Sequence, residues 1–329
     1  MVSDFAVRYA SSPISKLMFI TAVVCTHNPR RDLLDATLAG LQQQSLSTNE
    51  WEFLLVDNGS SEPLADAVDL SWHPRGRVIR EDRLGLTYAR YRSYREAHGA
   101  VIVYIDDDNV LASDYLDNAA RILEANPKMG AIGGKSLPRY EAEPPVWFAS
   151  LGINLACRDL GDQTMTASWE SVPQNERSYP RCAPVGAGMA IRKEAYRAYV
   201  EAAENDPVRS ALGRKGEDLA SGEDNDMVMS VLAAGWDVGY FPELSLEHII
   251  PESRLSRDYL ARHSYSSNKT WVLVLDVHGI RPWPPIPAWT VPLRRAKAYM
   301  QYRAWRDDAG YIKWKGTSGQ YEGRALLQV

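Results

Sequence analysis

The sequence has few cysteines and no long apolar run, and each scarcity excludes a class of protein. Its three cysteines, Cys25, Cys157 and Cys182, lack the paired spacing of a metal site, and their odd number argues against a disulfide scaffold. No apolar run approaches the roughly 18 residues that a membrane-spanning helix needs. The apolar stretch 17–25 is short and continues into a strand pattern, unlike a signal peptide. We therefore expect a soluble, cytoplasmic protein.

Positive charge and the common nucleotide-binding motifs are scarce as well. The 329 residues carry a net charge of −5, which argues against a general nucleic-acid binder. No GxGxxG or GxxxxGK[ST] motif is present, which weakens the interpretations as a dinucleotide-dependent dehydrogenase or a P-loop enzyme. Only five phenylalanines accompany ten tryptophans and 17 tyrosines. Such amphipathic rings are common on sugar-binding and membrane-interface surfaces, although many belong to the core.

The sequence does contain an α/β pattern. Short apolar segments at 19–25, 53–56 and 101–105 are typical of buried strands, residues 77–80 predict a further short strand, and helical patterns lie between these segments. This alternation over residues 18–135 predicts a mainly parallel sheet flanked by helices. Asn28 followed by Pro29 is expected to cap the first helix.

The pattern changes along the second half of the chain. Two short strands are expected at 239–242 and 244–248. The elements expected beyond residue 250 are a helix at 255–278, an irregular segment with five prolines at 282–292, a basic helix at 294–306 and a polar, glycine-rich tail from residue 310. We predict a catalytic domain over residues 1–250 and a helical, proline-rich C-terminal extension over residues 251–329.

Three consecutive acids follow the apolar strand at 101–105. Asp106, Asp107 and Asp108 repel one another, so we expect them where the strand emerges into a cleft and not inside the sheet. A divalent cation would neutralise them, because carboxylate oxygens are the ligands that such a cation prefers. The alternative, a solvated strand end, would need only one acid.

Further polar residues lie at the ends of predicted elements. Asp57 ends the second strand, where an acid contacts a nucleotide or closes an Asx-turn. Glu223 and Asp224 begin a helix, where they either stabilise its dipole or supply a general base. His248 follows a strand pattern and is either a metal ligand or a structural residue. Arg254 is a candidate for neutralising phosphate.

Six sequence blocks occur in the order seen in family-two glycosyltransferases of the GT-A fold. They are TAVVCTHN (21–28), LVDNGS (55–60), GLTYAR (85–90), YIDDD (104–108), GAGMA (186–190) and GED (222–224). The resemblance covers about residues 18–255. It implies a Rossmann-like GT-A sheet, a nucleotide-diphosphate sugar as donor, most often a UDP-sugar, and Mn²⁺ or Mg²⁺ as cofactor. It also implies inversion of the anomeric centre in one displacement.

The resemblance further implies roles for individual residues. The positions that it places at the nucleotide are Thr26, Asn28, Arg30, Asp57, Arg90, Asp106 and Asp107. Asp108 and His248 match metal ligands. Asp224 matches the base that deprotonates the acceptor hydroxyl, and Glu223 matches a residue that contacts sugar hydroxyls.

Two regions differ from the family pattern or lie where the family varies. The segment 301–305, QYRAW, is similar to the QxxRW motif of processive synthases, but its arginine is misplaced, so we expect one sugar per encounter. Trp147 lies in a variable stretch and is expected either to stack on an acceptor sugar or to pack in the core. The basic, aromatic C-terminal extension is either a peripheral contact with anionic lipid or a plain helical cap.

These observations together predict a metal-dependent inverting glycosyltransferase. We expect a glycan or lipid-linked acceptor in surface polysaccharide biosynthesis, with the enzyme either free in the cytoplasm or peripheral at the inner face of the cell membrane. One alternative is a sugar-nucleotide nucleotidyltransferase, which would require a glycine-rich, cation-bearing loop where this chain has residues 26–29, THNP. The other is a non-catalytic sugar-binding module, although all the expected acids are present.

Overall fold

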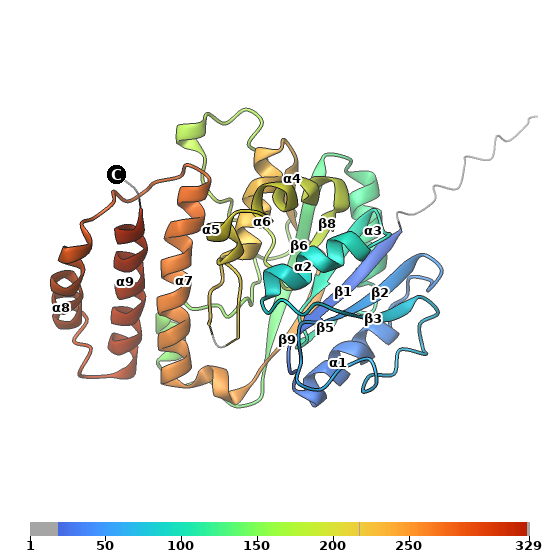
Figure 1. Ribbon diagram of the computed structural model, residues 1–329, viewed down its shortest axis with the longest axis horizontal. Helices are drawn as coiled ribbons and strands as arrows, with labels where there is room; N and C mark the ends of the chain where they lie inside the picture. The colour runs from blue at the N-terminus through green and yellow to red at the C-terminus, as the bar shows by residue number, and fades with distance from the viewer. Residues whose placement is uncertain (1–18, 217, 328–329) are drawn as a thin grey trace, which may run out of the picture.

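A mixed sheet with helices on both faces forms the centre of the computed structural model, which describes residues 19–216 and 218–327 (Figure 1). The segment before the first expected strand, residues 1–18, lies outside the described residues. The strands are β1 (Ile20–Thr26), β2 (Trp51–Asp57), β3 (Gly76–Arg80), β4 (Val101–Ile105), β5 (Asn109–Leu111), β6 (Met129–Tyr140), β7 (Met165–Ala167), β8 (Ala190–Arg192) and β9 (Asp237–Ile250). Their order is β3-β2-β1-β4-β8-β6-β9-β5, and β7 pairs with β9.

The first half of the sheet is parallel, as the alternating pattern predicted. Strand β1 pairs in parallel with β2 and β4, and β2 pairs in parallel with β3. Every residue of β2 and β4 is buried, which matches their continuous apolar runs. The later strand β8 runs antiparallel to β4 and β6, so the complete sheet is mixed.

Helices cover both faces of this sheet and continue into a C-terminal layer. The α-helices are α1 (Arg31–Gln42), α2 (Leu86–Glu96), α3 (Tyr115–Ala125), α4 (Lys193–Ala203), α5 (Pro207–Ser210), α6 (Glu223–Ala233), α7 (Arg257–Val277), α8 (Val291–Gln301) and α9 (Asp308–Leu326). Short 3₁₀ turns are η1 (Phe148–Leu151), η2 (Gln174–Glu176), η3 (Glu252–Leu255) and η4 (Ala288–Thr290). Helices α1 and α3 pack in one apolar core, and α2, α4 and α6 pack in the other.

The expected cap of the first helix is wrong. Helix α1 begins two residues after Pro29, and Arg30 precedes it without a side-chain cap. Asn28 instead adopts a left-handed backbone conformation with φ of 47°. Its side-chain oxygen accepts hydrogen bonds of 2.9 Å from both the backbone nitrogen and the hydroxyl of Ser61. Asn28 therefore ties two loops together, a use that its tolerance of left-handed backbone allows.

Two boundaries predicted near the C-terminus also differ. The two short strands expected at 239–248 are one strand, β9. The predicted break is a bulge, where the register against β6 jumps from Gly133–Tyr240 to Lys135–Ser245. The basic helix expected at 294–306 begins earlier and ends earlier, as α8.

The polar, glycine-rich tail from residue 310 forms helix α9. Glycine lowers helix propensity, so the composition of the tail did not by itself indicate this helix. Gly316, Gly319 and Gly323 lie on one face of α9, where an added Cβ at Gly319 would collide with the backbone carbonyl of Tyr265 in α7. Gly319 and Gly323 let α9 pack directly against the backbone of α7, Gly316 faces the Ser264 side chain, and this close packing outweighs the low helix propensity of glycine. Within the described residues, no helix has the length and apolar character needed to cross a membrane.

Candidate active site

The carboxyl ends of β1 and β4 open into a cavity of about 480 Å³. It is also lined by the start of α6, by helix α7 and by Gly213, Arg214, Gly216, Ala220 and Ser221. Nine of the thirteen predicted site residues line it: Thr26, Arg90, Asp106, Asp107, Asp108, Glu223, Asp224, His248 and Arg254. The structure thus brings together side chains from positions that are more than 200 residues apart in the sequence.

The acids that follow β4 have different surroundings. The Thr26 hydroxyl donates a hydrogen bond to the Asp107 carboxylate. Burial and the neighbouring Asp108 raise the pKa of Asp107 to about 6. Burial would also raise the pKa of Asp108, but hydrogen bonding to His248 and the charge of Arg254 hold it below the usual value. Asp108 is therefore the more strongly anionic of the two.

A carboxylate and an imidazole converge in this part of the cavity. The Nε2 atom of His248 lies 3.3 Å from Oδ1 of Asp108, and both side chains are buried. Neighbouring ligands of an octahedral ion with bonds of about 2.1 Å lie roughly 3 Å apart, so this pair fits a divalent cation. In the described part of the chain, no group of three or more His, Cys, Asp and Glu side chains forms a metal site. Ions such as Mg²⁺ are often held by one or two protein ligands together with substrate phosphates, which suits the pair.

Arg254 carries the positive charge nearest to this pair. Its Nη2 atom lies 2.8 Å from Oδ2 of Asp108, and its Nη1 atom lies 3.3 Å from Nε2 of His248. Burial alone would lower the pKa of His248, but its hydrogen bonds to Asp108 and Cys157 raise that pKa to about 9. Asp108 therefore supplies a negative charge, His248 binds a proton, and Arg254 supplies a positive charge suited to a phosphate.

The other wall of the cavity holds a second pair of acids at the start of α6. Asp224 accepts a hydrogen bond of 3.0 Å from the backbone nitrogen of Gly186, and burial raises its pKa despite the nearby Arg90. Glu223 is paired with Arg90 at 3.1 Å, and burial raises the pKa of Glu223 to about 7. A helix N-terminus would lower these pKa values, so desolvation is the larger effect here. Asp224 is thus oriented and more basic than an ordinary aspartate.

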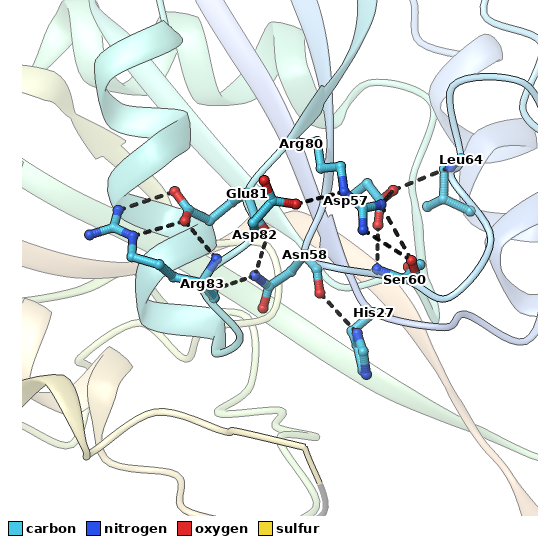
Figure 2. A network of polar contacts seen from close by, with 9 residues as sticks. All are labelled: His27, Asp57, Asn58, Ser60, Leu64, Arg80, Glu81, Asp82 and Arg83. Atoms are coloured by element: carbon cyan, nitrogen blue, oxygen red, sulfur yellow. Dashed lines mark hydrogen bonds and ion pairs between the residues drawn. The ribbon is translucent and has the colours of Figure 1, made fainter.

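Asp57 does not line the cavity. Its carboxylate accepts hydrogen bonds from the backbone nitrogens of Ser60 and Leu64 and from Arg80, at 2.8, 3.2 and 2.8 Å (Figure 2). The following residue, Asn58, lines the cavity in its place, and its backbone carbonyl is 2.8 Å from Nδ1 of His27. Asn58 directly follows Asp57 in the sequence, and this position next to a predicted site acid could have indicated that Asn58 lines the cavity.

Three other predicted residues lie away from the cavity. Arg30 is exposed and pairs with Asp32 and Glu141. Asn28 holds the loop at Ser61, as described above. Trp147 packs against an apolar cluster beneath η1.

Helix α7 contributes residues that the sequence did not single out. Tyr259, His263 and Ser267 line the cavity at a spacing of four residues. Burial and two nearby arginines lower the pKa of His263 to about 4, so it is neutral at pH 7. The hydroxyl of Ser267 lies 2.8 Å from that of Ser221. Polar residues at every fourth position of the predicted helix 255–278 were the sequence signal that could have indicated these cavity residues.

Comparison with known proteins places the chain among glycosyltransferases. The model described as glycosyl transferase family 2 matches residues 21–200, more than half of the chain. The succinoglycan biosynthesis protein ExoM of Rhizobium meliloti is 23% identical over 295 residues, covering 86% of this chain and 83% of ExoM.

Solved structures resemble the chain over most of its length. The mannosyltransferase PcManGT from Pyrobaculum calidifontis, in complex with GDP-Man and Mn²⁺, has a TM-score of 0.53 at 18% identity, covering 95% of this chain and 77% of that one. TarS residues 1–349 from S. aureus, in complex with UDP, has a TM-score of 0.52 at 13% identity, covering 93% and 90%. These likenesses confirm the predicted GT-A fold.

Proposed function

The chain belongs to glycosyl transferase family 2, and on that premise we propose that it is a metal-dependent inverting enzyme. It moves a sugar from a nucleotide-diphosphate sugar, with a UDP-sugar as the first candidate, to a hydroxyl of a glycan or lipid-linked acceptor. The observation that carries this proposal is one cavity that holds Asp108 with His248 and, on another wall, Asp224.

Asp224 is proposed to be the general base. Its carboxylate is oriented by the Gly186 nitrogen, and its raised pKa makes it a better proton acceptor than an ordinary aspartate. An added Cβ on Gly186 would lie 3.3 Å from Oδ2 of Asp224, so glycine keeps space next to the base. Asp224 takes the proton of the acceptor hydroxyl while that oxygen attacks the anomeric carbon and the nucleotide diphosphate leaves. The neighbouring Glu223, held by Arg90, is proposed to contact sugar hydroxyls.

Asp108 and His248 are proposed to hold Mn²⁺ or Mg²⁺. When bound, the ion supplies positive charge for the departing diphosphate. Arg254 lies against the same carboxylate and is proposed to contact the phosphates. Thr26, Arg90, Asp106 and Asp107 line the cavity and are proposed to lie on the nucleotide side. For Asn28, Arg30, Asp57 and Trp147, the contacts described above support structural roles better than direct ligand contacts.

The acceptor and the cellular setting are proposed from the relatives. ExoM is described as a succinoglycan biosynthesis protein, which supports a role in building a polysaccharide. We propose addition of a single sugar per encounter, in the cytoplasm, to an acceptor at the inner face of the membrane.

A screen of nucleotide sugars tests the proposal. Purified chain is incubated with UDP- and GDP-sugars in Mn²⁺, in Mg²⁺ or in EDTA, and the released nucleotide is measured. We expect slow release of a nucleoside diphosphate from one donor, lost in EDTA and in Asp108→Asn. Release of pyrophosphate would instead identify a nucleotidyltransferase. No binding of any nucleotide by calorimetry in the presence of metal would favour the non-catalytic sugar-binding module.

A further inference from the structure

Helix α8 and the turn before it expose an apolar stripe. Trp289, Leu293 and Met300 are 74%, 68% and 63% exposed, although large apolar side chains are usually buried. Leu293 and Met300 are seven residues apart and so lie on one face of α8, and Trp289 precedes them in the turn η4. Ala296, also exposed, lies between them on the same face. We call Trp289, Leu293, Ala296 and Met300 the outer stripe.

The opposite face of α8 is packed against the rest of the protein. Val291 and Ala298 are buried. The ring of Tyr299 meets Trp314 of α9 at a centroid distance of 5.1 Å, and the Trp314 indole nitrogen donates a 2.9 Å hydrogen bond to the backbone carbonyl of Arg295. Helix α8 is the outermost helix of the C-terminal layer, with α9 between it and α7 (Figure 1). The outer stripe therefore faces away from the rest of the molecule.

Positive charge surrounds this stripe. Residues 277–306 contain no aspartate or glutamate in a chain whose net charge is −5. The six cations of this segment are Arg281, Arg294, Arg295, Lys297, Arg303 and Arg306. Two of them have acidic neighbours, since Arg281 pairs with Asp276 and Arg295 lies 4.0 Å from Glu322. Lys297, Arg303 and Arg306 are exposed, as is Trp305 near the end of the segment.

We propose that the outer stripe and its cations dock on the surface of an anionic lipid bilayer. Apolar and tryptophan side chains enter the boundary between headgroups and acyl chains, while lysine and arginine bind the lipid charge. A second copy of this chain fits less well, because a symmetric contact would bring two cationic faces together. An anionic polysaccharide would use the cations but leave the apolar side chains in water.

The docking surface goes beyond the proposed function and does not depend on the identity of the donor. If the acceptor is lipid-linked, docking would hold the enzyme at the surface where that acceptor lies. The expected attachment is reversible and sensitive to salt, because one amphipathic helix buries little surface.

Sedimentation with lipid vesicles tests the proposal on the full chain. We expect binding to phosphatidylcholine vesicles that contain phosphatidylglycerol, weaker binding at high salt and little binding to phosphatidylcholine alone. The double variant Leu293→Asp, Met300→Asp should bind at least about tenfold more weakly, because two acidic groups would replace apolar side chains that become buried in the lipid. Lys297→Glu should weaken binding by a smaller factor. Val208→Asp is the matched control, an exposed apolar residue on α5 that should bind like the wild type.

Three results would overturn the proposal. The first is no sedimentation of the wild type with anionic vesicles. The second is equal binding by the wild type and the double variant, when circular dichroism shows both to be folded. The third is a wild-type dimer by light scattering that the double variant converts to a monomer, which would assign the stripe to a second copy. The nucleotide-sugar screen is done without lipid, so its failure and the failure of docking are separate results.

Discussion

The carboxyl edge of the sheet and the outer face of α8 depart from the usual distribution of side chains in opposite directions. In the cavity at this edge, Asp108, Glu223 and Arg90 have charged side chains, and these residues are at least 96% buried. On α8, Trp289 and Leu293 are apolar and mostly exposed. Buried charges and exposed apolar patches are the informative exceptions in a folded protein, and these two regions show one of each kind.

The two regions differ in how they accommodate these unusual side chains. Each buried charge has a partner, since Arg90 pairs with Glu223 and Arg254 pairs with Asp108. Such pairs rarely stabilise a fold, because desolvation offsets the attraction between the charges. The outer stripe has no comparable internal partner among the described residues, and α8 is held by its inner face. Neither departure is explained by stability, and we propose a ligand for each: a diphosphate with its cation in the cavity, and lipid at α8.

The largest expected effect comes from breaking the buried site at its base. Asp224→Asn should lower kcat by about 10²–10⁴, because the amide cannot accept the proton of the acceptor hydroxyl. Nucleotide affinity should change little, since Asp224 lies on the wall away from Asp108. Single-turnover transfer and calorimetric binding of the nucleotide measure the two effects.

A matched control separates catalysis from helix chemistry. Glu194 is an acid in the first turn of α4, outside the cavity, so Glu194→Gln removes a comparable dipole interaction. Its kcat should equal that of the wild type. Full activity in Asp224→Asn would remove the base assignment and leave the acids at α6 as helix-stabilising residues.

The next effect concerns the free energy of unfolding and its dependence on pH. Glu223 has a folded-state pKa of about 7, raised by burial above the usual 4.5. The native state therefore binds more protons than the unfolded state between these values, and the contribution of Glu223 is lost as pH rises through 7. Relative to Glu223→Gln, the wild type should lose about 3 kcal/mol of stability between pH 4 and pH 8. Urea unfolding of both proteins over this range measures the change, and a constant difference would contradict the assigned burial.

The two regions also differ in how well the sequence predicts them. Continuous apolar runs predicted the parallel strands β1, β2 and β4, and the acids that follow β4 predicted where the cavity lies. This worked because a buried strand has a simple pattern, and three adjacent carboxylates can lie only at its end. For Asp224, which is far from these acids in sequence, the helix pattern left two roles open, and the resemblance to a family favoured the role of general base.

The remaining features depend on contacts that no local pattern encodes. Asn58 lines the cavity instead of Asp57 because the carboxylate of Asp57 is used by two backbone nitrogens and Arg80. Helix α9 forms despite Gly319 and Gly323 because those positions touch the backbone of α7. The exposure of the outer stripe could not be predicted either, because periodicity indicates an apolar face but does not say whether that face is covered.

The smallest expected effect sharpens the comparison within one helix. Leu293→Ala should change the free energy of unfolding by less than about 0.5 kcal/mol, because its side chain is already in water. Val291→Ala, on the buried face of the same helix, should cost about 1–2 kcal/mol, because two buried methyl-sized groups are lost. Urea unfolding of both variants measures the difference. A loss at Leu293 as large as that at Val291 would mean that the outer stripe stabilises the fold, and the reason for assigning it to a lipid surface would disappear.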